Sequence, residues 1–123
     1  MHELSIAEAV VQIAARHARG RTVTKVELKV GYLRQVVPSA LSFAFELTAV
    51  GTSVEGADLE IEEVPAAGWC RTCEARTALP EMPLWCRKCG SSDVEVTEGE
   101  ELLVDSLELE EDEMLATSGE VSV

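Results

Sequence analysis

Hydrophobic residues recur at helical spacing along the first twenty positions of the chain. Ser5 and Glu8 match the S-x-x-E pattern of a capping box, and Gly20 interrupts the repeat. The sequence therefore predicts an amphipathic helix that packs through one apolar stripe. The residues of this stripe are Leu4, Ala7, Val11, Ala14 and Ala18.

Three later segments alternate apolar and polar residues, as strands covered on one face do. They cover residues 22–30, 58–64 and 101–110. Between the first two segments, a proline in a favoured first-turn position and an apolar stripe predict a second helix over residues 38–50. This strand, helix and strand favour a right-handed crossover with two parallel strands, and we expect the third strand to join the same sheet.

All four cysteines of the chain lie between the second and third predicted strands, with the spacing C-x2-C-x12-C-x2-C. Two such pairs can surround one ion with four thiolates in a closed tetrahedral shell, which leaves no position for a substrate. Zinc suits this ligand set, so we expect a structural zinc site. A rubredoxin-like iron site and a thioredoxin-like dithiol are the alternatives. The expected zinc ligands are Cys70, Cys73, Cys86 and Cys89.

These elements define an α+β fold. We expect a small mixed three-stranded sheet with two helices, and a zinc-ribbon-like module inserted before the last strand. The expected organisation is an α/β domain of residues 1–65 and 98–110, a zinc module of residues 66–97, and an acidic flexible tail of residues 111–123. Trp69 and Trp85 each precede a cysteine pair, and we expect both to pack as the core of the zinc module.

Charge is distributed unevenly along the 123 residues, whose formal net charge is −13. Eleven acidic residues and no Lys or Arg lie between Glu95 and Val123. Nucleic-acid and anionic-membrane binding both require clustered basic residues, so neither is expected. No segment resembles a signal peptide or a membrane span, which predicts a cytoplasmic protein with reduced cysteines.

The chain begins Met1-His2-Glu3, and this start has metal-binding chemistry of its own. The Met1 amine, the His2 amide nitrogen and the His2 imidazole Nδ1 can close two chelate rings on one ion. Three nitrogens in a plane favour nickel(II) or copper(II). Glu3, water or a ligand from another protein are candidates for the fourth position. His17 is expected to be an ordinary helix residue.

Several segments together resemble the HypA/HybF family of hydrogenase nickel-insertion accessory proteins. They are MHELSIAEAV at the start, VGYLRQVVPSALSFAFELT, GADLEIEEVP and the two cysteine pairs. The resemblance runs from residue 1 to about residue 110. It implies that His2 binds nickel, that the four cysteines bind zinc, and that a GTPase partner helps deliver nickel to the hydrogenase large subunit.

The resulting expectation is a nickel metallochaperone rather than an enzyme, because no nucleophile and base pair, phosphate-binding loop or open catalytic metal is apparent. A zinc-ribbon module that binds nucleic acid or another protein is the alternative. The sequence leaves open whether the recipient is hydrogenase alone or also urease, and whether the chain is a monomer or a weak homodimer.

Overall fold

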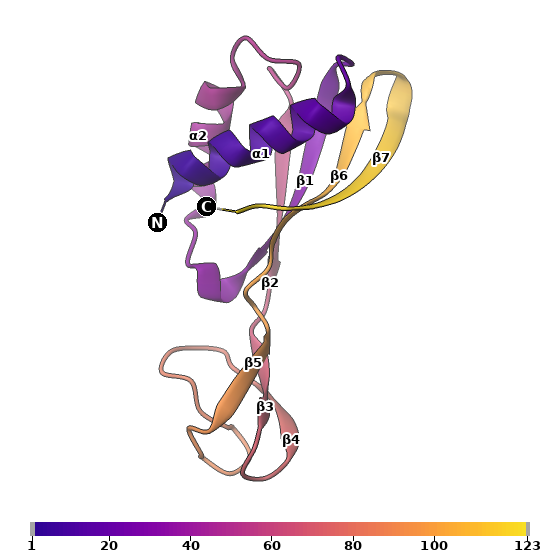
Figure 1. Cartoon of the computed structure of the whole chain (residues 1–123). Helices are drawn as coiled ribbons and strands as arrows, with labels where there is room; N and C mark the ends of the chain where they lie inside the picture. The colour runs from indigo at the N-terminus through magenta and orange to yellow at the C-terminus, as the bar shows by residue number, and fades with distance from the viewer. Residues whose placement is uncertain (1, 123) are drawn as a thin grey trace.

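The computed structural model describes residues 2–122, apart from the side chain of Asp112, and contains two helices and two separate sheets (Figure 1). Within these residues, no helix is long and apolar enough to cross a membrane. The elements in chain order are α1 (Glu3–Ala18), β1 (Val23–Gly31), a short 3-10 helix (Tyr32–Arg34), α2 (Pro38–Ala49), β2 (Asp58–Val64), β3 (Ala67–Cys70), β4 (Ala75–Ala78), β5 (Val94–Glu98), β6 (Leu102–Leu109), a second 3-10 turn (Glu110–Asp112) and β7 (Glu113–Glu120).

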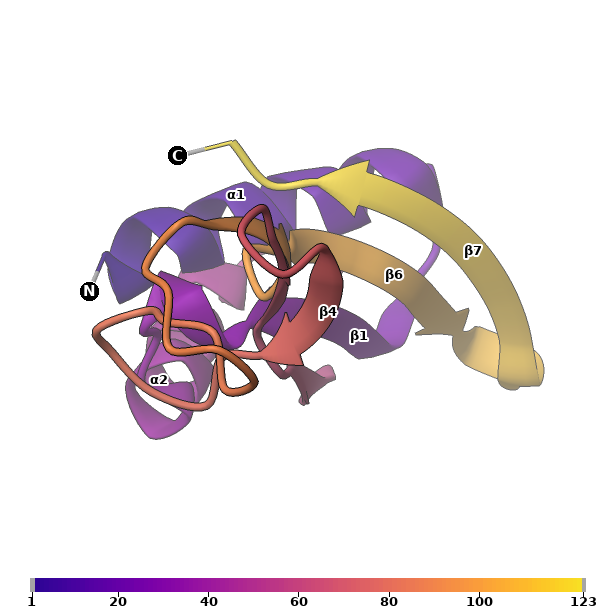
Figure 2. The ribbon, with the colours of Figure 1, turned by 90° about the horizontal axis from the view of Figure 1, so that it is seen from below.

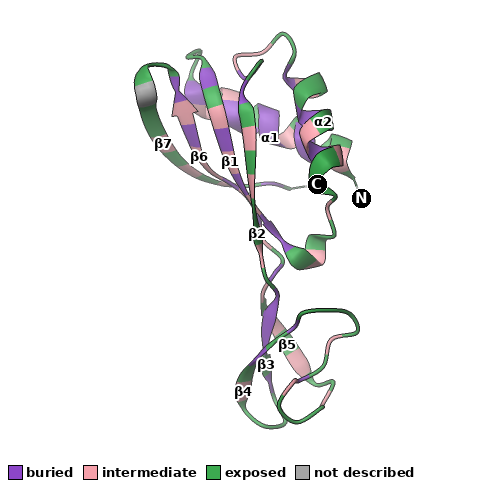
Figure 3. Ribbon diagram, turned by 180° about the vertical axis from the view of Figure 1, so that it is seen from behind, coloured by how far each residue is buried: buried purple, intermediate pink, exposed green. Residues whose placement is uncertain are grey.

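The larger sheet has the strand order β2-β1-β6-β7. The strands β1 and β2 are parallel, with Val26 opposite Leu59, and α2 is the crossover between them, as the sequence predicts. The strand β6 pairs antiparallel with β1, with Val30 opposite Leu102. Both helices lie on one face of this sheet (Figures 1 and 3). The expected α+β fold with two helices and a mixed sheet is therefore confirmed.

The expectation of an irregular acidic tail is wrong for most of its length, and the sheet has four strands rather than three. The strand β7 pairs antiparallel with β6, with Leu107 opposite Leu115. Leu115 and Val121 pack against the core, whereas the charged residues of β7 remain exposed. Exposed and half-buried residues alternate along β7, but its inward positions after Leu115 are Thr117 and Gly119, so the sequence lacks the apolar alternation that identifies a half-buried strand.

The helix α1 begins two residues before the predicted capping box. Its N-cap residue is His2, with no side-chain cap, so Ser5 lies inside the helix and the predicted capping box is wrong. Leu4 is also 56% exposed, although the pattern placed it in the apolar stripe. The helix packs against the sheet and α2 through its buried residues, which are Ile6, Ala7, Val10, Val11, Ile13, Ala14 and Ala18.

The smaller sheet has the order β4-β3-β5 and is inserted between β2 and β6. It extends away from the helices, and two chain segments connect it to the larger sheet (Figure 1). At this junction the Gly31 N–H donates to the Glu101 carbonyl at 2.7 Å, and the Leu33 N–H donates to the Gly99 carbonyl at 2.8 Å. These backbone bonds tie the end of β1 to the returning segment.

Candidate metal centre and family

Turns of the smaller sheet bring the four cysteines together. Cys70 is the last residue of β3, Cys73 lies in the turn before β4, and Cys86 and Cys89 lie in the turn that precedes β5. The four sulfur atoms all lie within 4.8 Å of one another, which confirms that the two predicted pairs form a single cluster.

The spacing of the sulfurs fits a tetrahedral metal ion. Cys70 Sγ is 3.6 Å from Cys89 Sγ, and Cys73 Sγ is 3.7 Å from Cys86 Sγ. A zinc ion with bonds of about 2.3 Å to four sulfurs in a tetrahedron requires separations of about 3.8 Å. A disulfide would require about 2.05 Å, and all four cysteines are free thiols. The donor set and its spacing therefore match a tetrathiolate site.

Backbone N–H groups support negative charge on two of the sulfurs. The Lys88 N–H donates to Cys86 Sγ at 3.3 Å. Burial raises the pKa of Cys86, but N–H groups of Cys89 and Lys88 together with the Cys73 thiol outweigh this and lower it to about 6. The Cys73 N–H is the main cause of a lowered pKa at Cys70.

The other two thiols are held in the neutral form. Burial among the neighbouring sulfurs raises the pKa of Cys73 to about 12, and contacts with Cys86 and Cys70 add to this effect. Four thiolates cannot be crowded together without a cation to balance their charge. A dication bound at the centre would supply that charge and deprotonate the remaining thiols.

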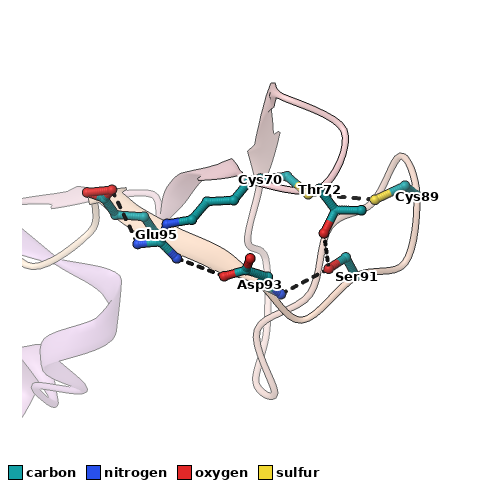
Figure 4. A network of polar contacts seen from close by, with 7 residues as sticks. Cys70, Thr72, Cys89, Ser91, Asp93 and Glu95 are labelled. Carbon is teal, nitrogen blue, oxygen red and sulfur yellow. Dashed lines mark hydrogen bonds and ion pairs between the residues drawn. The ribbon is translucent and has the colours of Figure 1, made fainter.

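Hydroxyl groups link the two cysteine turns, and the sequence analysis missed them. Thr72 Oγ1 and Ser91 Oγ are 2.8 Å apart, and the Asp93 N–H donates to Ser91 Oγ at 3.1 Å (Figure 4). On the other side, the Arg87 N–H donates to Oγ1 of the buried Thr77 at 2.9 Å. The only sequence signal was a Ser or Thr close to each pair, which is too common to be specific.

Most basic side chains of the small sheet are already engaged by neighbouring groups. Arg71 Nη1 lies 2.9 Å from Asp93 Oδ1, and Arg76 Nη2 lies 2.7 Å from Glu98 Oε1. The guanidinium of Arg87 stacks 3.6 Å above the ring of Trp85. These contacts leave little basic surface for phosphate groups, which argues against the nucleic-acid alternative.

The two tryptophans do not form the core of the small sheet, contrary to expectation. Trp69 is 44% exposed and Trp85 is 38% exposed. Successive residues of a strand point to opposite faces, and the buried Gly68 and Cys70 occupy the inner face of β3. Trp69 therefore points outward.

The second candidate site lies where α1 begins, beside the larger sheet and apart from the small sheet that carries the cysteines (Figure 1). His2 is exposed and precedes α1, and its carbonyl accepts the Ile6 N–H at 3.0 Å. The Glu3 carboxylate accepts a hydrogen bond from the Val37 N–H at 3.2 Å, which attaches this end of α1 to the segment before α2. The expected amine ligand, Met1, lies outside the described residues.

His17 is too distant to share an ion with His2. It lies fifteen positions further along the same helix, which corresponds to about 22 Å at 1.5 Å per residue. Its Nδ1 is 2.9 Å from the Ile13 carbonyl oxygen, one turn earlier. The two histidines therefore belong to different parts of the surface.

Most of the chain matches the model of one protein family. Residues 1–109 match the family model described as hydrogenase/urease nickel incorporation, metallochaperone, HypA. The chain belongs to the HypA family. The matched region begins with the N-terminal His2 segment, includes all four cysteines and ends with β6.

Curated HypA relatives resemble the chain over most of its length. The hydrogenase maturation factor HypA of Geotalea uraniireducens is 47% identical over 110 residues, which are 89% of this chain and all of the relative. The corresponding factor of a Nostoc species is 42% identical over 111 residues, or 90% of this chain and 97% of the relative. That of a Roseiflexus species is 43% identical over 122 residues, or 96% of this chain and 99% of the relative.

Solved HypA structures share the fold. A solution structure of a HypA protein superimposes with a TM-score of 0.65 at 25% identity and covers 89% of this chain and 96% of its own. The solution structure of the nickel metallochaperone HypA from Helicobacter pylori gives the same TM-score at 24% identity, covering 89% and 97% of the two chains. The second likeness supports the fold alone.

Proposed function

We propose that the chain carries one nickel(II) ion at its N-terminus and delivers it, with a GTPase partner, to the large subunit of [NiFe] hydrogenase. The observation that carries this proposal is the match to a nickel metallochaperone family from residue 1 onward, with His2 exposed at the start of α1. The ligands are the Met1 amine, the His2 amide nitrogen and the His2 imidazole, with Glu3 as a candidate for the fourth position.

The position of His2 before the helix suits this chemistry. The first N–H groups of an α-helix have no partner within the helix, so α1 does not itself require the amide nitrogens of its first residues. The His2 imidazole is exposed, so an ion held there remains accessible to a recipient protein. Because the amine must lose a proton, and α-amino groups have pKa values of about 7.7–8, nickel affinity rises with pH through this range.

Zinc is the occupant we assign to the cysteine cluster, where its role is structural. A zinc ion held by Cys70, Cys73, Cys86 and Cys89 has a closed shell with no position for substrate. It fixes the turns of the small sheet, which itself has little apolar core. Neither metal site has the arrangement of a catalytic centre, so GTP hydrolysis is assigned to the partner and the chain is not assigned an enzymatic activity.

A nickel titration of His2 variants tests the N-terminal site. Zinc-loaded wild-type chain, with a free N-terminus, should bind one nickel ion in isothermal titration calorimetry and show the absorption of a planar nickel complex. His2→Ala should lose that spectrum and bind nickel at least tenfold more weakly, because it removes a ring-closing nitrogen. His17→Ala is the matched control and should bind as wild type does.

Transfer to a recipient tests the delivery step separately. Nickel-loaded wild type mixed with the GTPase, GTP and an immature hydrogenase large subunit should yield more nickel in the large subunit than His2→Ala does under the same conditions. Urease apoprotein serves as the second recipient, since the family description names both enzymes. Equal transfer by wild type and His2→Ala would exclude the N-terminal site as the carrier.

A further inference from the structure

A seam runs between α1 and β7 in the part of the molecule that holds the larger sheet (Figures 1 and 2). Two hollows lie along this seam, with volumes of about 650 Å³ and 320 Å³, and both are lined by Arg16 and His17. The larger hollow also has Leu115 of β7 in its wall. In the smaller one, Gly119 and Glu120 of β7 face α1. The hollows share Arg16 and His17, so they lie next to each other, and together we call them the groove.

More basic than acidic side chains line the groove, although the chain as a whole is strongly acidic: Glu120 lies in the wall of the smaller hollow. Its larger hollow is lined by three arginines within six positions, Arg16, Arg19 and Arg21. Arg21 is already paired, since both of its terminal nitrogens lie 2.8 Å from the Glu113 carboxylate oxygens. Among the described residues, neither Arg16 nor Arg19 has a carboxylate oxygen within 4.0 Å of its guanidinium. Two exposed cations therefore face the groove without an acidic partner.

His17 adds a hydrogen-bond acceptor to the groove. Its Nδ1 lies 2.9 Å from the Ile13 carbonyl oxygen, and a carbonyl can only accept, so Nδ1 carries the hydrogen. In the neutral ring the other nitrogen, Nε2, then bears no hydrogen and accepts a hydrogen bond, for example from a backbone N–H of a bound peptide. A Cβ built on Gly119 would lie 3.9 Å from His17 Cε1, which shows that β7 and the imidazole are neighbours.

The opposite wall of the groove is a sheet edge. Among the described strands, β7 pairs only with β6, so its outer edge carries backbone N–H and C=O groups without a strand partner. Such an edge can accept an extended peptide as an additional strand. The groove thus combines a backbone edge on one side with cationic side chains on the other.

We propose that this groove binds an extended acidic peptide segment of a partner protein, which pairs with the outer edge of β7 while its carboxylates contact Arg16 and Arg19. Charge complementarity selects the acidic side chains, and the open, elongated form beside a strand edge selects a peptide over a small anion. A long polyanion such as a nucleic acid would extend beyond the groove onto the acidic remainder of the chain, whereas a short acidic segment contacts the groove alone.

The proposed surface is independent of both metal sites. His17 lies about 22 Å along α1 from His2, and the cysteines belong to the other sheet. It also depends on β7, which begins after the family match ends at residue 109. The groove is therefore a feature that the matched family region does not itself define, and its failure would leave the proposed nickel function untouched.

A fluorescence-anisotropy titration tests the groove with a defined probe. The probe is a fluorescein-labelled peptide of about ten residues that alternates Val and Glu, and the control peptide alternates Val and Lys. The zinc-loaded full chain should bind the acidic peptide and not the basic one, and added sodium chloride should weaken binding. Arg16→Gln with Arg19→Gln should weaken it roughly tenfold, since each removes one exposed charge contact.

Three controls make the result decisive. Lys88→Gln removes one positive charge elsewhere and should bind the peptide as wild type does. Arg16→Gln alone should bind the peptide more weakly than wild type. Zinc content and circular dichroism confirm that each variant is folded. A probe methylated on alternate backbone nitrogens should bind more weakly if it pairs with β7. The proposal is overturned by unchanged binding in the double arginine variant, by unchanged binding of the methylated probe, or by equally effective competition from inorganic phosphate.

Discussion

Gly31 lies so close to the backbone of Gly99 that no side chain fits at position 31. A Cβ built on Gly31 would be 2.1 Å from the carbonyl carbon of Gly99, and the atom in conflict belongs to the backbone. Gly99 itself has a φ of +111°, which side-chain-bearing residues rarely adopt, and it lies against Ala66. The two glycines therefore hold the junction between the sheets in a form that depends on their lack of side chains.

Replacing Gly31 by alanine should destabilise the protein. The new methyl group would force the backbone of Gly99 to move, and overpacking of this kind costs about 1–3 kcal/mol in the free energy of unfolding. Urea denaturation followed by circular dichroism measures the loss. Gly20→Ala is the matched control, because Gly20 has no neighbour within 4 Å and is strained only by its φ of +85°, at a cost of about 1 kcal/mol. Equal losses in the two variants would contradict the steric argument.

Removal of one cysteine should release the zinc without removing the nickel site. Cys73→Ser and Cys89→Ser each leave three thiolates, so zinc content should fall from one ion per chain to near zero by elemental analysis. Residues 66–97 should then lose protection from amide hydrogen exchange. Nickel affinity at the N-terminus should stay within about twofold, since the two sites lie in different parts of the fold. Variants that retain one zinc per chain would refute the four-cysteine assignment.

An additional residue before Met1 should abolish nickel binding with the wild-type affinity and spectrum. Such an extension converts the amine into an amide and removes a ligand that cannot be replaced locally. The extended chain should fold and keep its zinc, which serves as the folding control, while a C-terminal extension should leave nickel binding unchanged. Nickel titration with absorption spectroscopy compares the three proteins. An extended chain with the wild-type affinity and spectrum would move the site away from His2.

Lys25 should stabilise the larger sheet only below strongly alkaline pH. Its ammonium lies 3.3 Å from Glu60, 3.6 Å from Glu27 and 3.7 Å from Glu108, and these carboxylates, chiefly Glu60, raise the pKa of Lys25 above its usual 10.5. A raised pKa means that the stabilisation is fully present below pH 10.5 and is lost as the pH rises through the higher folded-state value.

The variant Lys25→Met isolates this contribution. The melting temperature of wild type should exceed that of Lys25→Met by a constant amount from about pH 7 to pH 10 and by a smaller amount above about pH 11, provided both remain folded. The comparison cancels the titration of other lysines, which both proteins share. A difference that does not change with pH would show that the Lys25 ion pairs contribute nothing to stability.

Strong periodicity made most of the larger sheet predictable from sequence. The strand at 58–64 was predicted with the bounds that the structure shows, because its alternation ends abruptly at a proline. The cysteine cluster was equally clear, since two C-x2-C pairs at this separation are typical of a metal site with four thiolates. The parallel pairing of β1 and β2 followed from the helix between them.

The elements that escaped prediction are those with weak local signals. The strand β7 contains Gly119, which approaches α1 closely enough that a Cβ there would lie 2.8 Å from Ile13. In the sequence, a glycine in such a segment suggests that a strand ends there. In the fold, Gly119 permits close contact between β7 and the helix. Likewise, the capping-box motif at Ser5 and Glu8 was overridden because tertiary contacts extend α1 back to Glu3. The strands β3 and β4 have only four residues each, and β5, which does alternate, has only five.

The insertion of the small sheet between β2 and β6 also constrains the order in which the chain can assemble. The inserted segment precedes β6 in the chain, so pairing of β6 with β1 closes a long loop. Closing a long flexible loop is entropically unfavourable. Pairing of Ala67 with Glu98 brings the two ends of that segment together. If the cysteine turns capture an ion first, as proposed, the inserted segment becomes a short connector. Metal capture would then lower the entropic barrier to completing a sheet that contains none of the cysteines.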